Sequence, residues 1–179
     1  MEKQINYLRI LPCDKYQEIN QEILNYLHSI NILDSDQGFW NPIPVVDFLK
    51  NNKLFLEWLN QTGLKIKTLA VTIGHNINCC GPHIDTPPAR FKLSWPILNT
   101  EYSYNRWFEE AKENCNKHIN TLGGVNYLNV DELRELFCAP VIYPAIIDAG
   151  TIHDVWYKEP GQFPRIGLQC QLVNEPKEL

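Results

Sequence analysis

The stretch Arg165-Ile-Gly-Leu-Gln-Cys-Gln-Leu172 alternates without a break between two kinds of side chain. In an extended chain, successive side chains point to opposite faces, so this alternation predicts a β-strand with one face on an apolar core. The apolar face would carry Ile166, Leu168, Cys170 and Leu172, and the opposite face would carry Arg165, Gly167, Gln169 and Gln171.

Two earlier stretches have the same period of two. Lys65 to Ile73 alternates about Leu69, Val71 and Ile73. Residues 90–97 place Phe91, Leu93, Trp95 and Ile97 on one face and Arg90, Lys92 and Ser94 on the other. Another apolar run, 141–147, leads into a turn at Asp148-Ala-Gly150. The repeated alternation in this half of the chain favours an antiparallel β core over a parallel α/β sheet.

The first part of the chain is predicted to support this core. Residues 4–11 form a plausible first strand, and apolar residues spaced by three and four predict an amphipathic helix to about Asn31. Residues 34–42 have loop composition, and two short helices follow around Asn51-Asn52, ending at Gly63. With 179 residues, 44% of them hydrophobic, we expect one domain, in which residues 1–63 support a core at 64–175.

The region 99–140 is the least regular part of the predicted core. We expect a helix from Asn105 to about Lys112, a turn at 121–124 and a short helix from Asp131 through Phe137. A connection of this length in a small domain is typical of an insertion or a lid over a site.

The segment Pro82-His-Ile-Asp-Thr86 contains a candidate metal-binding pair. In an extended segment His83 and Asp85 point to the same side and can hold one ion together. A second histidine, His153, lies in Asp148-Ala-Gly-Thr-Ile-His-Asp-Val155. Two histidines and one carboxylate form the set that binds Fe(II) on one face and leaves positions open for oxygen chemistry.

Arg165 is a candidate partner for an anionic cosubstrate. It follows His153 by twelve residues, one turn and one strand later, which would bring it back beside the metal in an antiparallel sheet. Its guanidinium suits a carboxylate bidentately, and Gly167 on the same face would leave room for the ligand.

The order His83-x-Asp85, His153, Arg165 resembles that of the Fe(II)- and 2-oxoglutarate-dependent dioxygenases, most closely their aspartyl/asparaginyl β-hydroxylase and prolyl-hydroxylase-like branches. The resemblance covers residues 64–173 and includes Pro164-Arg-Ile-Gly-Leu168. It implies a mainly β (α+β) fold, a double-stranded β-helix or cupin-like jelly roll with N-terminal supporting helices. It further implies Fe(II) bound by His83, Asp85 and His153, 2-oxoglutarate held by Arg165, and dioxygen as the oxidant.

The resemblance also identifies secondary candidates and a reaction. In the β-hydroxylase-like branch, the strand similar to residues 90–95 faces the cosubstrate, so Arg90, Lys92 and Ser94 are further cosubstrate-binding candidates. Lys92 stands where that branch often has a second histidine. The implied reaction is hydroxylation of a C–H bond in a small-molecule or peptide substrate, with an amino-acid side chain, free or in a peptide, favoured.

Two other interpretations remain open on the sequence. Zinc could be bound by His75, Cys79, Cys80 and His83, or by Cys115 with His118, although neither set has the paired short loops typical of zinc sites. The alternative outside enzymology is a non-catalytic cupin-like module that binds a metal or a small ligand without turnover.

Composition restricts the partners. A net charge of −5 with no block of like charges gives no electrostatic footprint for long nucleic acid or an anionic membrane surface. The amino-terminal residues lack a signal-peptide pattern, and no apolar run has the length of a membrane span. We therefore expect a cytoplasmic protein whose six scattered cysteines are reduced thiols.

Overall fold

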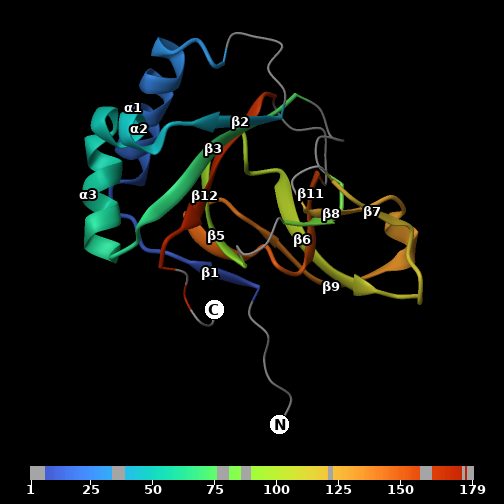
Figure 1. Ribbon diagram of the computed structural model, residues 1–179. Coiled ribbons are helices and arrows are strands. Elements are labelled where there is room, and N and C mark those ends of the chain that lie inside the picture. Colours follow the sequence, from blue (N-terminus) through green and yellow to red (C-terminus); the bar gives the residue numbers. More distant parts are fainter. Residues whose placement is uncertain are drawn as a thin grey trace.

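Two antiparallel six-stranded sheets and three helices make up the computed structural model, which describes residues 7–33, 39–75, 81–85, 90–120, 123–157, 163–174 and 176. The sheets pack face to face, and the helices lie against the outer surface of the first sheet (Figure 1). This arrangement confirms the prediction of a mainly β protein with helices contributed by its first part.

The first sheet contains the strands with the clearest alternation. Its strands run in the order β1-β10-β5-β12-β3-β2, and every neighbouring pair is antiparallel. Their bounds are β1 Leu8–Ile10, β2 Trp40–Ile43, β3 Ile66–Gly74, β5 Phe91–Leu98, β10 Ala145–Asp148 and β12 Arg165–Leu172.

The second sheet contains the other six strands, in the order β7-β8-β4-β11-β6-β9, again with antiparallel neighbours. Their bounds are β4 His83–Ile84, β6 Ser103–Glu110, β7 Lys117–Ile119, β8 Val125–Tyr127, β9 Leu133–Pro140 and β11 Ile152–Tyr157. A short 3-10 helix at Val130–Glu132 precedes β9.

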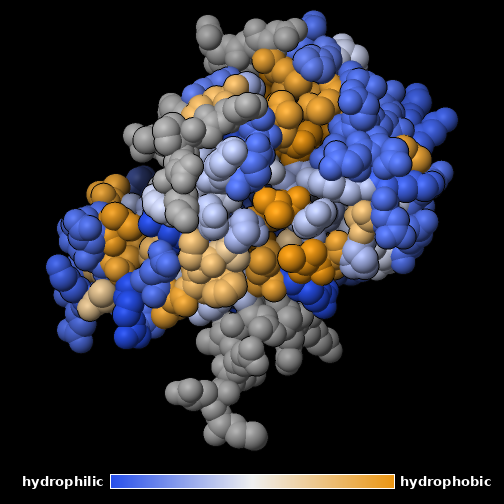
Figure 2. Space-filling view, turned by 180° about the vertical axis from the view of Figure 1, so that it is seen from behind, coloured by the Kyte–Doolittle hydropathy of each residue, from blue (hydrophilic) through white to orange (hydrophobic). Residues whose placement is uncertain are grey.

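The helices follow the predicted pattern closely. α1 spans Tyr16–Ser29 and buries Ile19, Ile23 and Leu27, which recur at helical spacing. α2 (Val45–Asn51) and α3 (Lys53–Thr62) are separated at Asn52. Gly63 ends α3 in the left-handed conformation, with φ of 72°, which glycine adopts at little cost. The side of the molecule formed by the helices presents a mostly hydrophilic outer surface, on the right in Figure 2.

The largest apolar core lies between these helices and the outer face of the first sheet. The predicted apolar face of β12 is confirmed, since Ile166, Leu168, Cys170 and Leu172 are all buried in this core. The opposite faces of β5 and β12 point toward the second sheet and carry buried polar side chains, among them Lys92, Ser94 and Arg165. The polar face of the first sheet is therefore inside the molecule.

Residues 99–140 differ most from expectation. The predicted helix at 105–112 is wrong, because residues 103–110 form β6, and the predicted helix at 131–137 is wrong, because β9 begins at Leu133. Instead of an insertion outside the core, the region contributes β6 to β9 to the second sheet. Residues 40–42, assigned to a loop, belong to the edge strand β2 (Trp40–Ile43). Part of the predicted turn, 121–122, lies outside the described residues.

Two further findings concern the chain as a whole. Where the structure describes the chain, none of its helices has both the length and the apolar character needed to cross a membrane. Cys13, Cys115, Cys138 and Cys170 are free thiols, and Cys79 and Cys80 lie outside the described residues.

Candidate metal centre

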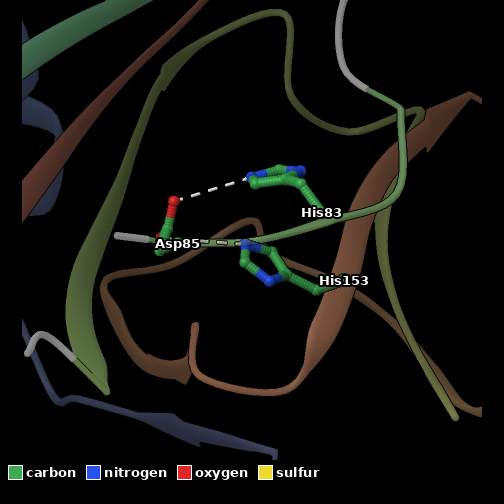
Figure 3. Close-up of side chains that lie close together, drawn as sticks. All are labelled: His83, Asp85 and His153. Carbon is green, nitrogen blue, oxygen red and sulfur yellow. Dashed lines mark ion pairs between the residues drawn. The ribbon is translucent and has the colours of Figure 1, made fainter. Parts of the chain in front are cut away.

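Two neighbouring strands of the second sheet bring the predicted metal ligands together. His83 on β4 lies directly opposite His153 on β11 in the antiparallel ladder, so the two side chains point to the same face. Asp85 follows β4 two residues after His83 and points to the same side. Figure 3 shows the two imidazoles and the carboxylate directed toward one another. The residues that the sequence spacing singled out thus form one cluster.

The distances fit three ligands of one ion. Nε2 of His83 lies 3.7 Å from Oδ1 of Asp85, and Nε2 of His153 lies 3.9 Å from Oδ2. One ligand atom from each of the three residues lies within 4.8 Å of the others. Within the described residues, no second group of three such side chains comes together in this way.

Backbone carbonyl groups fix the orientation of both imidazoles. Nδ1 of His83 lies 2.8 Å from the carbonyl oxygen of Gly81, and Nδ1 of His153 lies 2.9 Å from that of Thr151. A carbonyl oxygen can only accept, so each Nδ1 carries a proton, and in a neutral imidazole the lone pair is then on Nε2. This is the tautomer that a metal-binding imidazole needs, with the second nitrogen held as in known metal sites.

Asp148 shapes the turn that holds two of the ligands. Its Oδ1 accepts hydrogen bonds from the backbone N–H groups of Gly150 and Thr151, at 3.0 and 3.1 Å. In the same turn, the Ala149 carbonyl accepts from the Asp85 N–H, at 3.1 Å. Because the Thr151 carbonyl orients His153, this one turn positions a ligand from each of two strands.

The electrostatics keep His153 and Asp85 in the protonation states in which they can bind a cation. Burial, reinforced by the nearby His83, lowers the pKa of His153 to about 4, so this imidazole is neutral at pH 7. Burial alone would raise the pKa of Asp85, but the charge of Lys92, with smaller effects of the two imidazoles, lowers it below its ordinary value. Lys92 Nζ lies 2.5 Å from Asp85 Oδ2. Asp85 is therefore ionised.

Arg165 reaches the same pocket from the opposite sheet. The prediction that it returns beside His153 within one sheet is wrong, since β11 and β12 belong to different sheets. Its side chain crosses the interior, where Nε donates to Oγ of Ser103 on β6 at 2.9 Å. Arg165 and the three candidate ligands line one pocket of about 100 Å³.

The guanidinium of Arg165 is a buried charge with little compensation. It is 3% exposed, and no carboxylate within the described residues forms an ion pair with it. A buried charge is unfavourable unless it is paired. Gly167 leaves space beside it, because a Cβ there would lie 3.9 Å from Nη1 of Arg165 and 3.3 Å from the Trp95 carbonyl oxygen. The pocket therefore contains a buried positive charge.

The three secondary candidates on and before β5 have different positions. Lys92 lines the pocket and pairs with Asp85. Ser94 is buried but does not line the pocket, and its hydroxyl accepts a hydrogen bond from Gln169 at 3.0 Å. Arg90 precedes the strand, and its side chain is 62% exposed and lies 3.5 Å from Asp148. The structure does not bring Arg90 or Ser94 to the metal-binding cluster.

Sequence reasoning missed several residues of the pocket. Asn105 on β6 lines it, and Ser103 orients Arg165, but this segment was predicted to begin a helix. Trp40 lines the pocket from the edge strand β2, with Lys92 Nζ 5.4 Å from the centre of its ring. The alternation Ser103, Asn105, Trp107 was the available signal. It was hidden because the inward side chains here are mostly polar.

The zinc alternatives gain no support from the geometry. His83 lies with Asp85 and His153, and Cys79 and Cys80 are outside the described residues. Cys115 is buried with its sulfur 3.2 Å from the Lys112 carbonyl oxygen and 3.4 Å from that of Glu132, whereas His118 is exposed. Cys115 and His118 therefore do not form a metal site with other described side chains.

Comparison with known proteins finds a likeness in structure but none in sequence. No protein-family model matches the chain, and no curated protein matches its sequence. The crystal structure of AviO1 from Streptomyces viridochromogenes Tue57 is similar with a TM-score of 0.45 and 9% sequence identity, over 98% of this chain and 94% of that chain.

Proposed function

We propose that the protein is a non-haem Fe(II)- and 2-oxoglutarate-dependent oxygenase that hydroxylates a C–H bond. The observation that carries this proposal is the lining of one pocket, in which two imidazole Nε2 atoms and a carboxylate converge and to which a buried guanidinium also contributes. A cation site and an anion site in the same cavity match a metal ion together with an anionic cosubstrate.

The donor set fits ferrous iron. Two neutral imidazoles and one carboxylate form the set typical of non-haem Fe(II) oxygenases, and three ligands leave positions for other molecules. Zinc sites built for structure use four protein ligands, often thiolates, and the described residues offer no thiolate here. The imidazoles are already in the required tautomer, so the site is organised before an ion binds.

The buried guanidinium of Arg165 fits a dicarboxylate. A carboxylate bound at Arg165 would supply the counter-charge that the described residues lack, through bidentate hydrogen bonds for which a guanidinium is shaped. Two facing antiparallel sheets with the ligands on their inner faces also support the finer fold proposal, a double-stranded β-helix of the cupin type.

The chain's own groups have distinct roles in this mechanism. Iron and 2-oxoglutarate, when bound, supply the activation of dioxygen that oxidises the substrate. His83, Asp85 and His153 would hold the ion, and Asp85 would balance part of its charge. Arg165 would bind the distal carboxylate of 2-oxoglutarate, with Ser103 keeping the guanidinium in place. Lys92 holds the Asp85 carboxylate from the other sheet.

Formation of succinate tests the proposal. Purified protein should convert 2-oxoglutarate to succinate slowly without added substrate, and only with Fe(II) and oxygen present. A control protein with Asp85→Ala should lose this activity, because the third ligand is missing. Protein that binds metal but neither binds 2-oxoglutarate anaerobically nor turns it over would instead be the non-catalytic binding module, and the proposal would be wrong.

A further inference from the structure

A second pocket opens from the same cluster and has a different character. It measures about 530 Å³ and shares Trp40, His83, Asp85 and Lys92 with the smaller pocket that contains Arg165. We call it the outer groove. The rest of its described lining consists of apolar and uncharged polar side chains: Pro42, Thr68, Leu69, Ala70, Ile84, Asn120 and Gln171.

The two pockets lie along one pair of strands. In β12 the inward side chains run from Arg165, through Gly167 and Gln169, to Gln171. Strands β3 and β12 lie side by side (Figure 1), and their register places Thr72 beside Gly167 and Thr68 beside Gln171. Six residues of strand extend about 20 Å. The inward face of β12 therefore runs from the cationic Arg165 to the uncharged Gln171, whose register partner on β5 is Lys92.

Trp40 marks the boundary between the two pockets. It is 47% exposed, so much of its ring is open to a ligand. It stands on the edge strand β2, where its register partner is Thr72, and Pro42 of the same strand pairs with Ala70. Trp40 and Pro42 together provide a flat apolar wall beside small side chains, which suits a planar or hydrophobic group.

The carboxylate and the ammonium group that the described residues bring to the outer groove form an ion pair with each other. Among its described lining residues, Asp85 and Lys92 are the carboxylate and the ammonium group, and they bond to each other at 2.5 Å. A charged ligand group that leaves water needs a counter-charge. The described lining provides none beyond this pair, so a free amino acid, with both a carboxylate and an ammonium group, is a poor match.

We infer that the outer groove binds an uncharged, mainly apolar substrate that places a hydrophobic or planar group against Trp40. Its amide or hydroxyl groups would face Gln171 and Asn120. The inference rests on the proposed function, since it takes the groove as the route to the reacting centre.

Three probes that share one ring system test this inference: indole, which is neutral, tryptamine, which is cationic, and indole-3-acetate, which is anionic. Their affinities for the full chain are measured by ligand-observed NMR at pH 7.5, once without metal and once with Mn(II) and saturating 2-oxoglutarate. The second condition blocks Arg165 as a site for indole-3-acetate. In it, relaxation of the probe protons by Mn(II) reports how close the probe lies to the metal.

We expect indole to bind about tenfold more tightly than either charged probe, and Trp40→Ala to weaken indole binding about tenfold. The matched control is Trp156→Ala, because Trp156 is 38% exposed and does not line either pocket. Thr68→Arg, at an exposed position of the groove, should strengthen indole-3-acetate binding several-fold and leave tryptamine no tighter. This variant provides a test even if Trp40→Ala fails to fold.

The two conditions separate the inference from the proposed function. If a charged probe binds as tightly as indole, or if Trp40→Ala and Thr68→Arg leave the affinities unchanged, the inference is wrong, whatever the metal does. If Mn(II) and 2-oxoglutarate do not bind but indole still binds in a Trp40-dependent way without metal, the proposed function fails and the groove assignment stands.

Discussion

The two sheets contribute opposite charges to the same pocket. The second sheet supplies the candidate metal ligands, His83, Asp85 and His153, whereas the first sheet supplies the cations, Lys92 and Arg165. The ligands lie within 4.8 Å of one another on adjacent strands. The cations meet them only because the sheets face each other, through the Lys92–Asp85 ion pair and the Arg165–Ser103 hydrogen bond.

This difference implies that mutations can impair metal binding and anion binding separately. The spacing between His83 and His153 is set by the hydrogen-bond ladder of a single sheet. The position of Arg165 relative to them is set by the packing of two sheets. Changes in the second sheet should therefore reduce metal binding first, and changes in the first sheet should reduce anion binding first.

The largest effect is expected from His153→Ala in the second sheet. Four-ligand zinc sites bind with about 10–16 kcal/mol, so one ligand contributes about 2.5–4 kcal/mol, and its loss should weaken metal binding about 100- to 1000-fold. Titration of the metal-free protein with Co(II), followed by absorption spectroscopy, measures this. His118→Ala, at an exposed position of the same sheet, is the control. Equal Co(II) affinity of the two variants would remove His153 from the ligand set.

A second prediction concerns the stability of the metal-free protein. The ordinary pKa of histidine is 6.5, and in the folded protein burial lowers that of His153 to about 4. Between these values the unfolded chain takes up a proton that the folded chain does not. The stabilisation is therefore complete above pH 6.5 and is lost as the pH falls toward 4, by about 3 kcal/mol in total.

Urea unfolding at pH 7 and pH 4 measures this loss for the native chain and for His153→Gln. The variant has no imidazole at this position, so its unfolding free energy should fall by about 3 kcal/mol less between the two pH values. Asp85 does not contribute in this window, since its pKa lies below its ordinary value of 3.8. If both proteins lose the same free energy, His153 is not the group that titrates.

Arg165→Met tests the first sheet. It should reduce 2-oxoglutarate affinity about 30-fold, equivalent to about 2 kcal/mol, and leave Co(II) affinity nearly unchanged. Since it removes a buried charge that has no carboxylate partner among the described residues, the metal-free variant should be at least as stable as the native chain. Arg134→Met, which changes a surface arginine paired with Glu109, is the control. Loss of Co(II) binding in Arg165→Met would show that metal binding and anion binding cannot be impaired separately.

The same contrast explains what the sequence predicted well. Strands β3, β5 and β12 bury their outward side chains under three helices, so apolar residues occur at every second position and the period is plain. His83, Asp85 and His153 were also predictable, because a ladder between neighbouring extended strands keeps same-side residues close. Local periodicity was sufficient for both.

The second sheet was harder because its two faces are not cleanly divided into apolar and polar. In β6, the inward residues Ser103 and Asn105 are polar and buried, whereas Phe108 on the other face is also buried. In β9, five consecutive residues, 134–138, are exposed. Without a clear apolar period, the alternation in β6 was not recognised, and parts of both strands were predicted to be helical. Arg165 and His153 line the same pocket from different sheets. Their proximity depends on how the sheets pack, which local periodicity does not predict.

The smallest predicted effect comes from Asp148, which belongs to the first sheet but helps to orient metal ligands of the second. Asp148 ends β10 of the first sheet, yet the turn that it holds orients Asp85 through the Ala149 carbonyl and His153 through the Thr151 carbonyl. Asp148→Ala removes the acceptor of the Gly150 and Thr151 N–H groups and should lower Co(II) affinity about tenfold, as loss of an outer partner does. Asp148→Asn keeps an acceptor oxygen and should recover most of that affinity. Asp131→Ala, at an exposed position, is the control. If Asp148→Ala lowers the melting temperature but leaves Co(II) affinity at the native value, Asp148 supports the fold alone, and the metal site depends on the second sheet by itself.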